Sequence, residues 1–479
     1  MRYYYGVLKC KIWTLNYIEK KGTPMLISFP KNIFRKNYLR QSEIACAISE
    51  VIPIENLEYV YVSDKYGQIS YTTRSPFLNI HHAEESKMKI INGYPHVFFP
   101  HQELFKFVEE FLDKRDYTLF PLLIRFGDLH VDAPTPKLAH LRNFFLGDTI
   151  QRIYTQMGGN VTSIVGLGDV GNSMENMLSK LSCKNGCNGV SPMDCYYQIC
   201  KDARERYNAS LQRYNISYNK IVFDSDVYCG MDGLLKKYPS LQSEFYIRKN
   251  GMPKYILQEV LWWEYCMRSM PNAEQIYLIA NNQSEHLQNI KSTIQIFDMR
   301  YNVNYLSYAP VIHGASRDEA TWFLQIKNAF PKKLAYKLDG INISRMLDIY
   351  KAITIMEHID TEIDMHRIPH TTLKMYLDLL RAIKQDDIVI AGVREGGSLS
   401  IDGEKLLYLI ALTSYIFLRA IEKYDLHSII MHLNSIVKLI HRLSLSATCS
   451  GDRIVVAYAV KISKKIVEIV GIPDLSNIL

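Results

Sequence analysis

The segment AHLRNFFLGDTIQRIYTQMGGNVTSIVGLGDVGNS, residues 139–173, decides the fold class. Apolar side chains recur at helical spacing over residues 141–158, and Gly158 and Gly159 then end the predicted helix. The run NVTSIVGLG that follows is typical of a buried strand. Before the helix, PLLIRFGDLHVDAPTP (residues 121–136) has the pattern of a strand that leads into a proline-rich loop. Strand, helix and strand in this order predict a parallel α/β unit of the Rossmann type.

The pattern outside this unit divides the chain into three predicted parts. Residues 1–115 alternate short apolar runs with turn signals and end in a helical pattern, which predicts a small α+β domain. Residues 116–335 form the predicted α/β core, in which the polar, cysteine-containing stretch 181–245 is expected to be an insertion. Residues 336–479 have an almost purely helical pattern, which includes a single predicted helix over 405–424 and predicts an all-α bundle.

Composition and charge narrow the class of protein. Hydrophobic residues make up 48% of the 479 residues and charged residues 22%, a balance that lets most of the chain bury a core. No uncharged apolar run reaches the roughly 18 residues that a membrane span needs, and the N-terminus lacks a signal-peptide pattern. We therefore expect a cytoplasmic protein with no membrane partner. The net charge of +7 mildly favours a polyanionic partner.

Four of the nine cysteines lie close together, at Cys183, Cys187, Cys195 and Cys200. Their gaps do not match the paired Cys-x-x-Cys spacing that zinc sites usually show. We therefore expect no metal site, with a reduced, loop-rich stretch as the main interpretation and a zinc site as the alternative.

The deciding segment resembles the arginyl-tRNA synthetases. His140-Leu141-Arg142, then Gly147-Asp148, then Gly168-Asp169-Val170-Gly171 follow the order of that family's His-x-Gly-His, Leu-Arg, Gly-Asp and Gly-Asp-Trp-Gly elements. Two later segments, RKNGMPKYILQEV (248–260) and IYLIANNQSEHLQNIK (276–291), are similar to its Tyr-x-x-x-Asp and Gln-x-x-His segments. The helical C-terminus resembles its DALR anticodon-binding bundle. The resemblance covers roughly residues 120–479 and implies a class I synthetase-like core followed by that bundle.

The resemblance also implies that the nucleotide chemistry has eroded. The catalytic signature is reduced to Lys137 and His140, and Ala139 stands where the family has a glycine. Residues 308–333 hold no Lys-Met-Ser-Lys loop. By resemblance, the nucleotide-binding remnants are Ala139, Gly168, Asp169, Gly171 and His286. Activation of an amino acid depends on positive groups around the phosphates of ATP, so loss of both signatures should leave little activity.

The arginine pocket is half retained by the same comparison. Tyr255 and Glu259 would face the guanidinium group of arginine, and Gln283 its α-amino end. A carboxylate binds a guanidinium through two parallel hydrogen bonds, which Glu can make as well as Asp. The alternative interpretation is that Tyr255 and Glu259 lie on an ordinary amphipathic helix.

Basic residues of the C-terminal part could follow the phosphates of an RNA. The candidates are Lys438, Arg442, Arg453, Lys461, Lys464 and Lys465. The alternative is a solvated helix surface. What the resemblance implies is an arginine-tRNA-binding adaptor without a cofactor, similar to the DALR anticodon-binding domain-containing proteins, which would present the tRNA to a tRNA 3-methylcytidine methyltransferase. The alternatives are an active arginine-tRNA ligase that uses ATP with Mg²⁺, and a synthetase-derived subunit with no RNA role.

Overall fold

The structure is a computed structural model of the whole chain. It describes residues 26–28, 38–49, 60–64, 68–73, 88–113, 117–133, 135–171, 174, 177–178, 192–249, 251–283, 288–290, 292–293, 303–312, 318–329, 341–364, 370–384, 398–446 and 449–473. The predicted domain boundaries near residues 115 and 335 lie outside these ranges.

A six-stranded sheet organises the core. Its order is β1-β10-β9-β6-β7-β8, in which the last five strands run parallel and β1 (Leu26–Ser28) is antiparallel at the edge. The parallel strands are β6 (Leu122–His130), β7 (Val161–Gly168), β8 (Lys220–Phe223), β9 (Glu274–Ala280) and β10 (Val303–Tyr308). The chain fills one half of the sheet with β6, β7 and β8, and then the other half with β9 and β10. This doubly wound order confirms the predicted Rossmann-type sheet.

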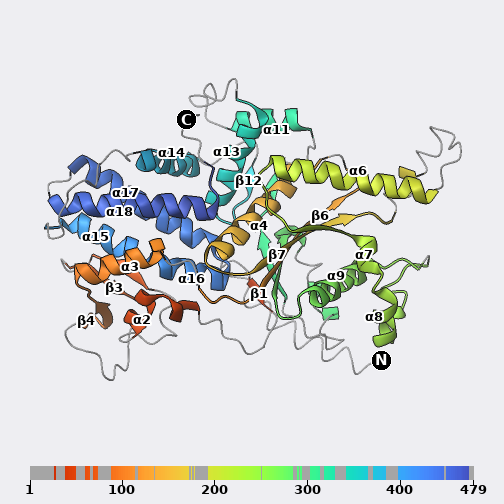
Figure 1. Ribbon diagram of the computed structural model, residues 1–479, viewed down its shortest axis with the longest axis horizontal. Helices are drawn as coiled ribbons and strands as arrows, with labels where there is room; N and C mark the ends of the chain where they lie inside the picture. Colours follow the sequence, from red (N-terminus) through yellow and green to blue (C-terminus); the bar gives the residue numbers. More distant parts are fainter. Residues whose placement is uncertain are drawn as a thin grey trace.

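Helices connect and cover the parallel strands (Figure 1). The crossover from β6 to β7 is α4 (Leu138–Gln156), which packs on β6 through the close approach of Gly147 to the Phe126 ring. A Cβ atom at 147 would lie 2.1 Å from that ring, so only glycine fits. Further helices in the described part of the core are α7 (Asp224–Tyr228), α8 (Met231–Lys237), α9 (Tyr255–Ser269) and α11 (Glu319–Ala329), with the 3-10 helices η4 (Pro239–Gln242) and η5 (Asn281–Gln283).

The described part of the stretch 181–245, which begins at residue 192, lies in the core, and this corrects the expectation of an insertion there. It contains the long helix α6 (Pro192–Arg213), which crosses from β7 to β8, and β8 itself is an edge strand of the parallel sheet. The polar composition misled the prediction because α6 lies along the edge of the molecule, where Figure 1 shows it extending away from the bundle.

The C-terminal part is a helical bundle, as predicted. It consists of α13 (Ile343–Met356), α14 (His370–Lys384), α15 (Ile401–Ala411), α16 (Thr413–Lys423), α17 (Leu426–Ser446) and α18 (Ser450–Val470). Two short strands, β11 (Val311–Ile312) and β12 (Ile363–Asp364), pair in parallel and join this part to the core. The single helix predicted over 405–424 is broken at Leu412, where the Thr413 hydroxyl donates to the Ile410 carbonyl and contacts His432 of α17.

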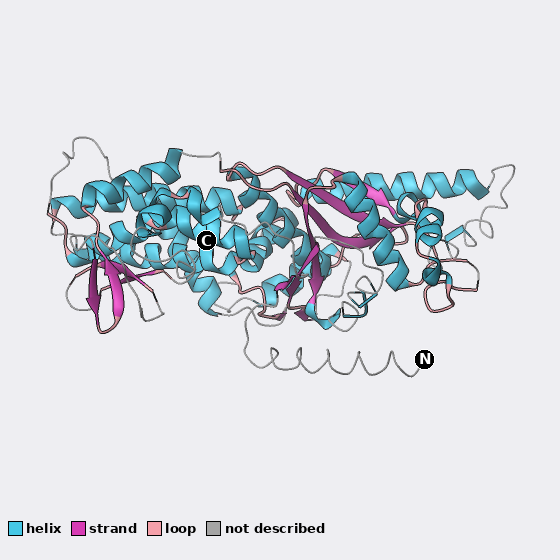
Figure 2. Cartoon of the chain, turned by 90° about the horizontal axis from the view of Figure 1, so that it is seen from below, coloured by secondary structure: helices cyan, strands magenta, loops and turns pink. Residues whose placement is uncertain are grey.

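The N-terminal α+β elements pack against this bundle (Figures 1 and 2). They are η1 (Tyr38–Gln41), α2 (Glu43–Ser49), α3 (His101–Asp113) and a four-stranded antiparallel sheet of β2 (Tyr61–Ser63), β3 (Ser70–Thr72), β5 (Tyr94–Val97) and β4 (Met88–Ile91). The Tyr71 hydroxyl donates to the Tyr408 carbonyl of α15, and the Tyr408 hydroxyl accepts from the Phe99 amide. The N-terminal elements and the bundle thus form one end of an elongated molecule, and the parallel sheet forms the other.

Candidate functional site

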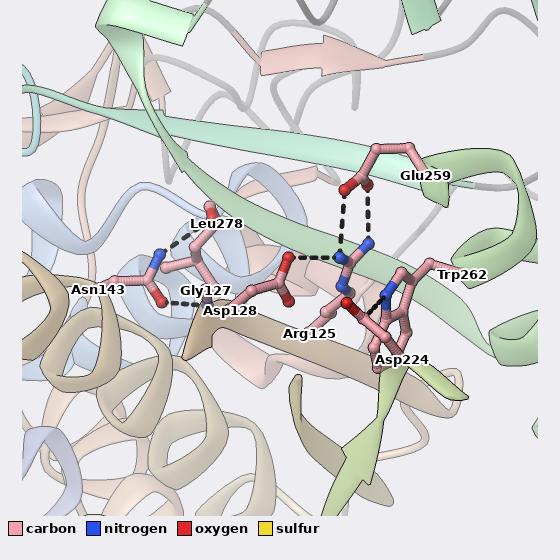
Figure 3. A network of polar contacts seen from close by, with 8 residues as sticks. All are labelled: Arg125, Gly127, Asp128, Asn143, Asp224, Glu259, Trp262 and Leu278. Atoms are coloured by element: carbon pink, nitrogen blue, oxygen red, sulfur yellow. Dashed lines mark hydrogen bonds and ion pairs between the residues drawn. The ribbon is translucent and has the colours of Figure 1, made fainter. Parts of the chain in front are cut away.

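The sheet has its switch point between β6 and β9, where the direction of strand addition reverses. Ligands of doubly wound sheets bind at the carboxyl ends of the strands beside this point. Asn143, on the first turns of α4, bridges the two strands here (Figure 3). Its amide accepts from the Gly127 backbone N–H at 2.8 Å and donates to the Leu278 carbonyl at 2.9 Å. Asn143 therefore fixes how far the two strand ends separate.

A buried guanidinium lies beside this bridge. Arg125 of β6 donates from Nη1 to Glu259 Oε2 at 2.8 Å and from Nη2 to Glu259 Oε1 at 3.2 Å, and Nη2 also donates to Asp128 Oδ2 at 2.8 Å (Figure 3). The guanidinium carbon lies 4.3 Å from the centre of the Trp262 ring and 4.4 Å from that of Tyr277. Glu259, predicted to bind the guanidinium of a substrate, is thus paired with a guanidinium of its own chain.

Acidic groups outnumber basic groups around this pair. Asp224, at the start of α7, accepts from Trp262 Nε1 at 2.9 Å. Burial, followed by repulsion from Asp128, raises the pKa of Asp224 to about 7. Burial alone would lower the pKa of Arg125, but Asp128 and Glu259 outweigh it and raise that pKa well above its ordinary value. The cluster therefore holds one permanently charged guanidinium among three carboxyl groups.

Glycine makes room for one of these carboxylates. A Cβ atom at Gly166 of β7 would lie 2.1 Å from Asp128 Oδ1, so no other residue at 166 allows Asp128 its position. A similar approach explains Gly168, where a Cβ atom would lie 2.7 Å from the Nδ1 atom of His130.

The residues predicted to be remnants of a catalytic signature lie at the N-terminus of α4. Lys137 is the residue before the helix, and its backbone N–H donates to the Nδ1 atom of His140 at 3.3 Å. Ala139 is partly buried and packs against the main core. Through this hydrogen bond the His140 ring caps the first turn of α4.

The two predicted nucleotide-binding residues that follow β7, Asp169 and Gly171, have different structural roles. Asp169 is buried and accepts from the Ser225 backbone N–H at 3.0 Å, from the Ser225 hydroxyl and from the Tyr196 hydroxyl. It therefore ties α6 and α7 to the end of β7. Gly171 has φ +88°, a conformation that favours glycine. Their assignment to a nucleotide stays a prediction.

The other predicted arginine-binding residues differ in exposure. Tyr255 begins α9 one turn before Glu259 and is 42% exposed. Gln283 is exposed in η5, directly after β9, and so lies at the carboxyl edge of the sheet. His286 lies outside the described residues. The structure thus places Tyr255 and Gln283 on elements that border the switch point, but only Glu259 in the buried cluster.

The basic residues of the bundle fall into two groups. Lys461, Lys464 and Lys465 of α18 line one cavity of about 310 Å³ together with Leu112, Gln156, Glu468 and Ile469. Lys465 also donates to the Phe111 and Leu112 carbonyls at the end of α3, so it joins the bundle to the N-terminal elements. Lys438 and Arg453 are exposed, and Arg442 pairs with Asp402 at 3.0 Å. These last three do not line that cavity.

Two residues of the deciding segment have structural roles that the sequence did not reveal. Arg142 is buried in α4 and donates to the backbone carbonyls of Ala309 and Thr361 at 2.5 and 2.8 Å. It thereby connects α4 to the segments beside β11 and β12, which lead from the sheet to the C-terminal bundle. Asp148 accepts from Lys351 of α13 at 2.8 Å and from Arg152 at 2.9 Å. Both are buried ties between α4 and the C-terminal part.

The four cysteines are only partly described. Cys183 and Cys187 lie outside the described ranges, while Cys195 and Cys200 lie on α6. Within the described residues, no group of three or more His, Cys, Asp or Glu side chains is arranged to hold a metal ion. No described helix is both long and apolar enough to cross a membrane.

The chain is similar in fold to solved arginyl-tRNA synthetases. The structure from Plasmodium falciparum matches with a TM-score of 0.61 at 12% identity, over 82% of this chain and 86% of that one. An arginyl-tRNA synthetase structure from Campylobacter jejuni gives 0.58 at 14% identity, over 78% and 99%. The Thermus thermophilus enzyme gives 0.57 at 12% identity, over 91% and 98%. No protein-family model and no curated protein sequence matches the chain. The chain therefore has an arginyl-tRNA synthetase-like fold.

Proposed function

We propose that this chain binds arginine tRNA in the cytoplasm without aminoacylating it, and presents the tRNA to a tRNA 3-methylcytidine methyltransferase. The synthetase-like fold over most of the chain supports the tRNA half of this proposal. The cavity lined by Lys461, Lys464 and Lys465 supports it further, because clustered cations attract phosphates. In this reading the tRNA contacts the bundle end of the molecule.

One observation carries the non-catalytic half. The carboxyl groups of Asp128, Asp224 and Glu259 converge beside the switch point, and the guanidinium among them, Arg125, is already bonded to two of them. Transfer at the α-phosphate of ATP needs positive groups that face the phosphate oxygens. A cluster of carboxyl groups supplies no such positive charge, and its one guanidinium is already bonded to two of them, so it does not fit the phosphates of ATP.

We also propose that these carboxylates do not bind a nucleotide indirectly, through a magnesium ion held between them and its phosphates. Mg²⁺ demands near-octahedral oxygen coordination and usually bridges carboxylates to substrate phosphates. Asp128 and Glu259 already accept hydrogen bonds from Arg125, so two of the three carboxyl groups are bonded to a guanidinium. The proposal is therefore that neither ATP nor Mg²⁺ serves as a cofactor, whereas the alternative, an active arginine-tRNA ligase, would need both.

The test combines three measurements on the purified chain. We expect no pyrophosphate exchange dependent on ATP and arginine, a gel shift with arginine tRNA that exceeds the shift with an unrelated tRNA, and faster 3-methylcytidine formation by the methyltransferase when the chain is added. Pyrophosphate exchange at an ordinary enzymatic rate would establish the ligase instead. Absence of any tRNA shift would favour a subunit without an RNA role.

A further inference from the structure

We propose that Arg125 is the permanent internal occupant of a guanidinium-binding site, so that the folded chain excludes free arginine and related guanidinium compounds from it. The inference deepens the proposed function, because it identifies what closes the amino-acid side of the same site. It also predicts a ligand class that the native chain hides: a small guanidinium cation should enter the site once the Arg125 side chain is removed.

The contacts of Arg125 are those of a bound guanidinium ligand. Two parallel bonds of 2.8 and 3.2 Å reach the two oxygens of Glu259, the paired geometry in which a carboxylate binds a guanidinium. A third bond of 2.8 Å reaches Asp128. The guanidinium also lies against the ring faces of Trp262 and Tyr277, at 4.3 and 4.4 Å. The site therefore satisfies the charge, the planarity and the donors of a guanidinium group.

The site binds the guanidinium end and not the stem of the side chain. The terminal nitrogens make all three hydrogen bonds, whereas the buried Nε atom of Arg125 makes none. One oxygen of Asp128 is buried without a hydrogen-bond partner as well. A detached guanidinium could turn within the site to reach this oxygen, since it has no stem to constrain it.

The charge balance argues against an ordinary core ion pair. Two carboxylates contact one guanidinium, and the charge of one of them, Asp128, also acts on the nearby Asp224 carboxyl. A buried ion pair rarely stabilises a fold more than apolar residues of the same size would. An excess of buried acid costs still more, so the arrangement is better explained by a cation-binding site than by a need for stability.

The position of Glu259 supplies the last step. The side chain comes from α9, the helix whose start resembles the arginine-recognition segment, and Arg125 is 134 residues away along the chain, on β6. An internal guanidinium at this carboxylate has an effective concentration that free arginine cannot match. We therefore expect tRNA binding by the native chain to be indifferent to arginine.

The decisive variants remove Arg125 and one carboxylate at a time. Arg125→Ala alone would leave the buried carboxylates of Asp128 and Glu259 without their cation, so it is expected to fold poorly. Asp128→Asn is therefore added, which gives the double variant R125A/D128N. The matched control, R125A/E259Q, removes the same side chain and the same charge but leaves the bidentate acceptor neutral. Thermal unfolding of each is measured with methylguanidinium chloride and with methylammonium chloride, at about 10 mM, well below denaturing concentrations.

We expect methylguanidinium to raise the Tm of R125A/D128N by about 1–3 °C, and methylammonium to leave it unchanged. The rise in R125A/E259Q should be less than half as large. Equal shifts in the two variants, or none in R125A/D128N, would show that Arg125 forms a structural ion pair only.

The native chain provides a second measurement that does not depend on how the variants fold. Calorimetric titration with free arginine should show no binding at millimolar concentration. Saturable arginine binding would overturn the inference and still leave tRNA binding without charging intact. Conversely, loss of the tRNA gel shift would overturn the proposed function and leave the guanidinium site untouched.

Discussion

Replacing Asp224 with asparagine should prevent the loss of folding stability that the Asp224 carboxyl causes as the pH rises. The carboxyl lies at the start of α7 and accepts a hydrogen bond from Trp262 Nε1 at 2.9 Å. Burial first, and then the charge of Asp128, raises its pKa to about 7, although Trp262 and Arg125 act in the opposite direction. Asp224→Asn keeps an acceptor oxygen for Trp262 and carries no charge at any pH.

The sign of the effect follows from proton binding. In the unfolded chain the carboxyl titrates at about its ordinary 3.8, so between that pH and 7 the folded chain holds a proton that the unfolded chain has lost. The stabilisation of the folded state by this bound proton is fully present below the pKa of the unfolded chain. It is lost as the pH rises through the pKa of the folded chain. A difference of about three pKa units corresponds to about 4 kcal/mol at 1.36 kcal/mol per unit, and the larger part falls above about pH 5.

Scanning calorimetry at about pH 5 and pH 8 measures the difference. We expect Asp224→Asn to unfold several degrees above the native chain at the higher pH, and the gap to shrink at the lower pH. Asp113→Asn is the control, because Asp113 is exposed at the end of α3. A gap that is the same at both pH values, or a variant less stable at the higher pH, would refute the reasoning.

Three further predictions concern the C-terminal part. Lys351→Met should lower the free energy of unfolding by about 3 kcal/mol, because it leaves the buried Asp148 carboxylate with one cation fewer; calorimetry checks this, and an unchanged Tm contradicts it. Changing Lys461, Lys464 and Lys465 together to Ala should weaken arginine-tRNA binding and flatten its salt dependence, whereas Lys465→Ala alone should mainly lower the Tm by releasing the end of α3. An unchanged tRNA affinity in a gel shift of the triple variant would remove these residues from the RNA surface.

Sequence reasoning succeeded where the pattern is local. The helical spacing over 141–158 and the apolar run at 160–168 correspond to α4 and β7, because period and turn residues act over a few positions. It failed where the structure of a segment involves contacts with residues that are distant in the sequence. At the break at Leu412, the Thr413 hydroxyl contacts His432 of another helix, and the polar stretch at 181–245 contains an edge strand that pairs with β7.

The candidate site shows the same division more sharply. The resemblance to the arginyl-tRNA synthetases singled out Glu259 as a carboxylate that would face the guanidinium of a substrate, and in the structure it pairs with the guanidinium of Arg125. No local signal identifies the partner, because Arg125 lies inside an apolar strand pattern 134 residues away. Asp128 and Asp224 were missed for a related reason: Asp128 lies within β6, Asp224 directly follows β8, and their convergence depends on the order of strands in the sheet.

The residues that reveal the fold are the ones that hold it together. Arg142 binds backbone carbonyls on both sides of the junction with the bundle, Asp148 receives Lys351 from α13, and Gly147 allows α4 to touch β6. Loss of Arg142 would leave buried carbonyls without this donor, loss of Asp148 would leave the Lys351 ammonium without its carboxylate, and a side chain at 147 would clash with the Phe126 ring. These residues are therefore required whether or not any reaction occurs. The predicted nucleotide-binding residues have structural roles as well, because Asp169 ties α6 and α7 to the end of β7 and the His140 ring accepts from the Lys137 N–H at the start of α4. The fold therefore needs the recognisable segment whether or not a nucleotide binds, which is why the motif alone predicts architecture and not activity.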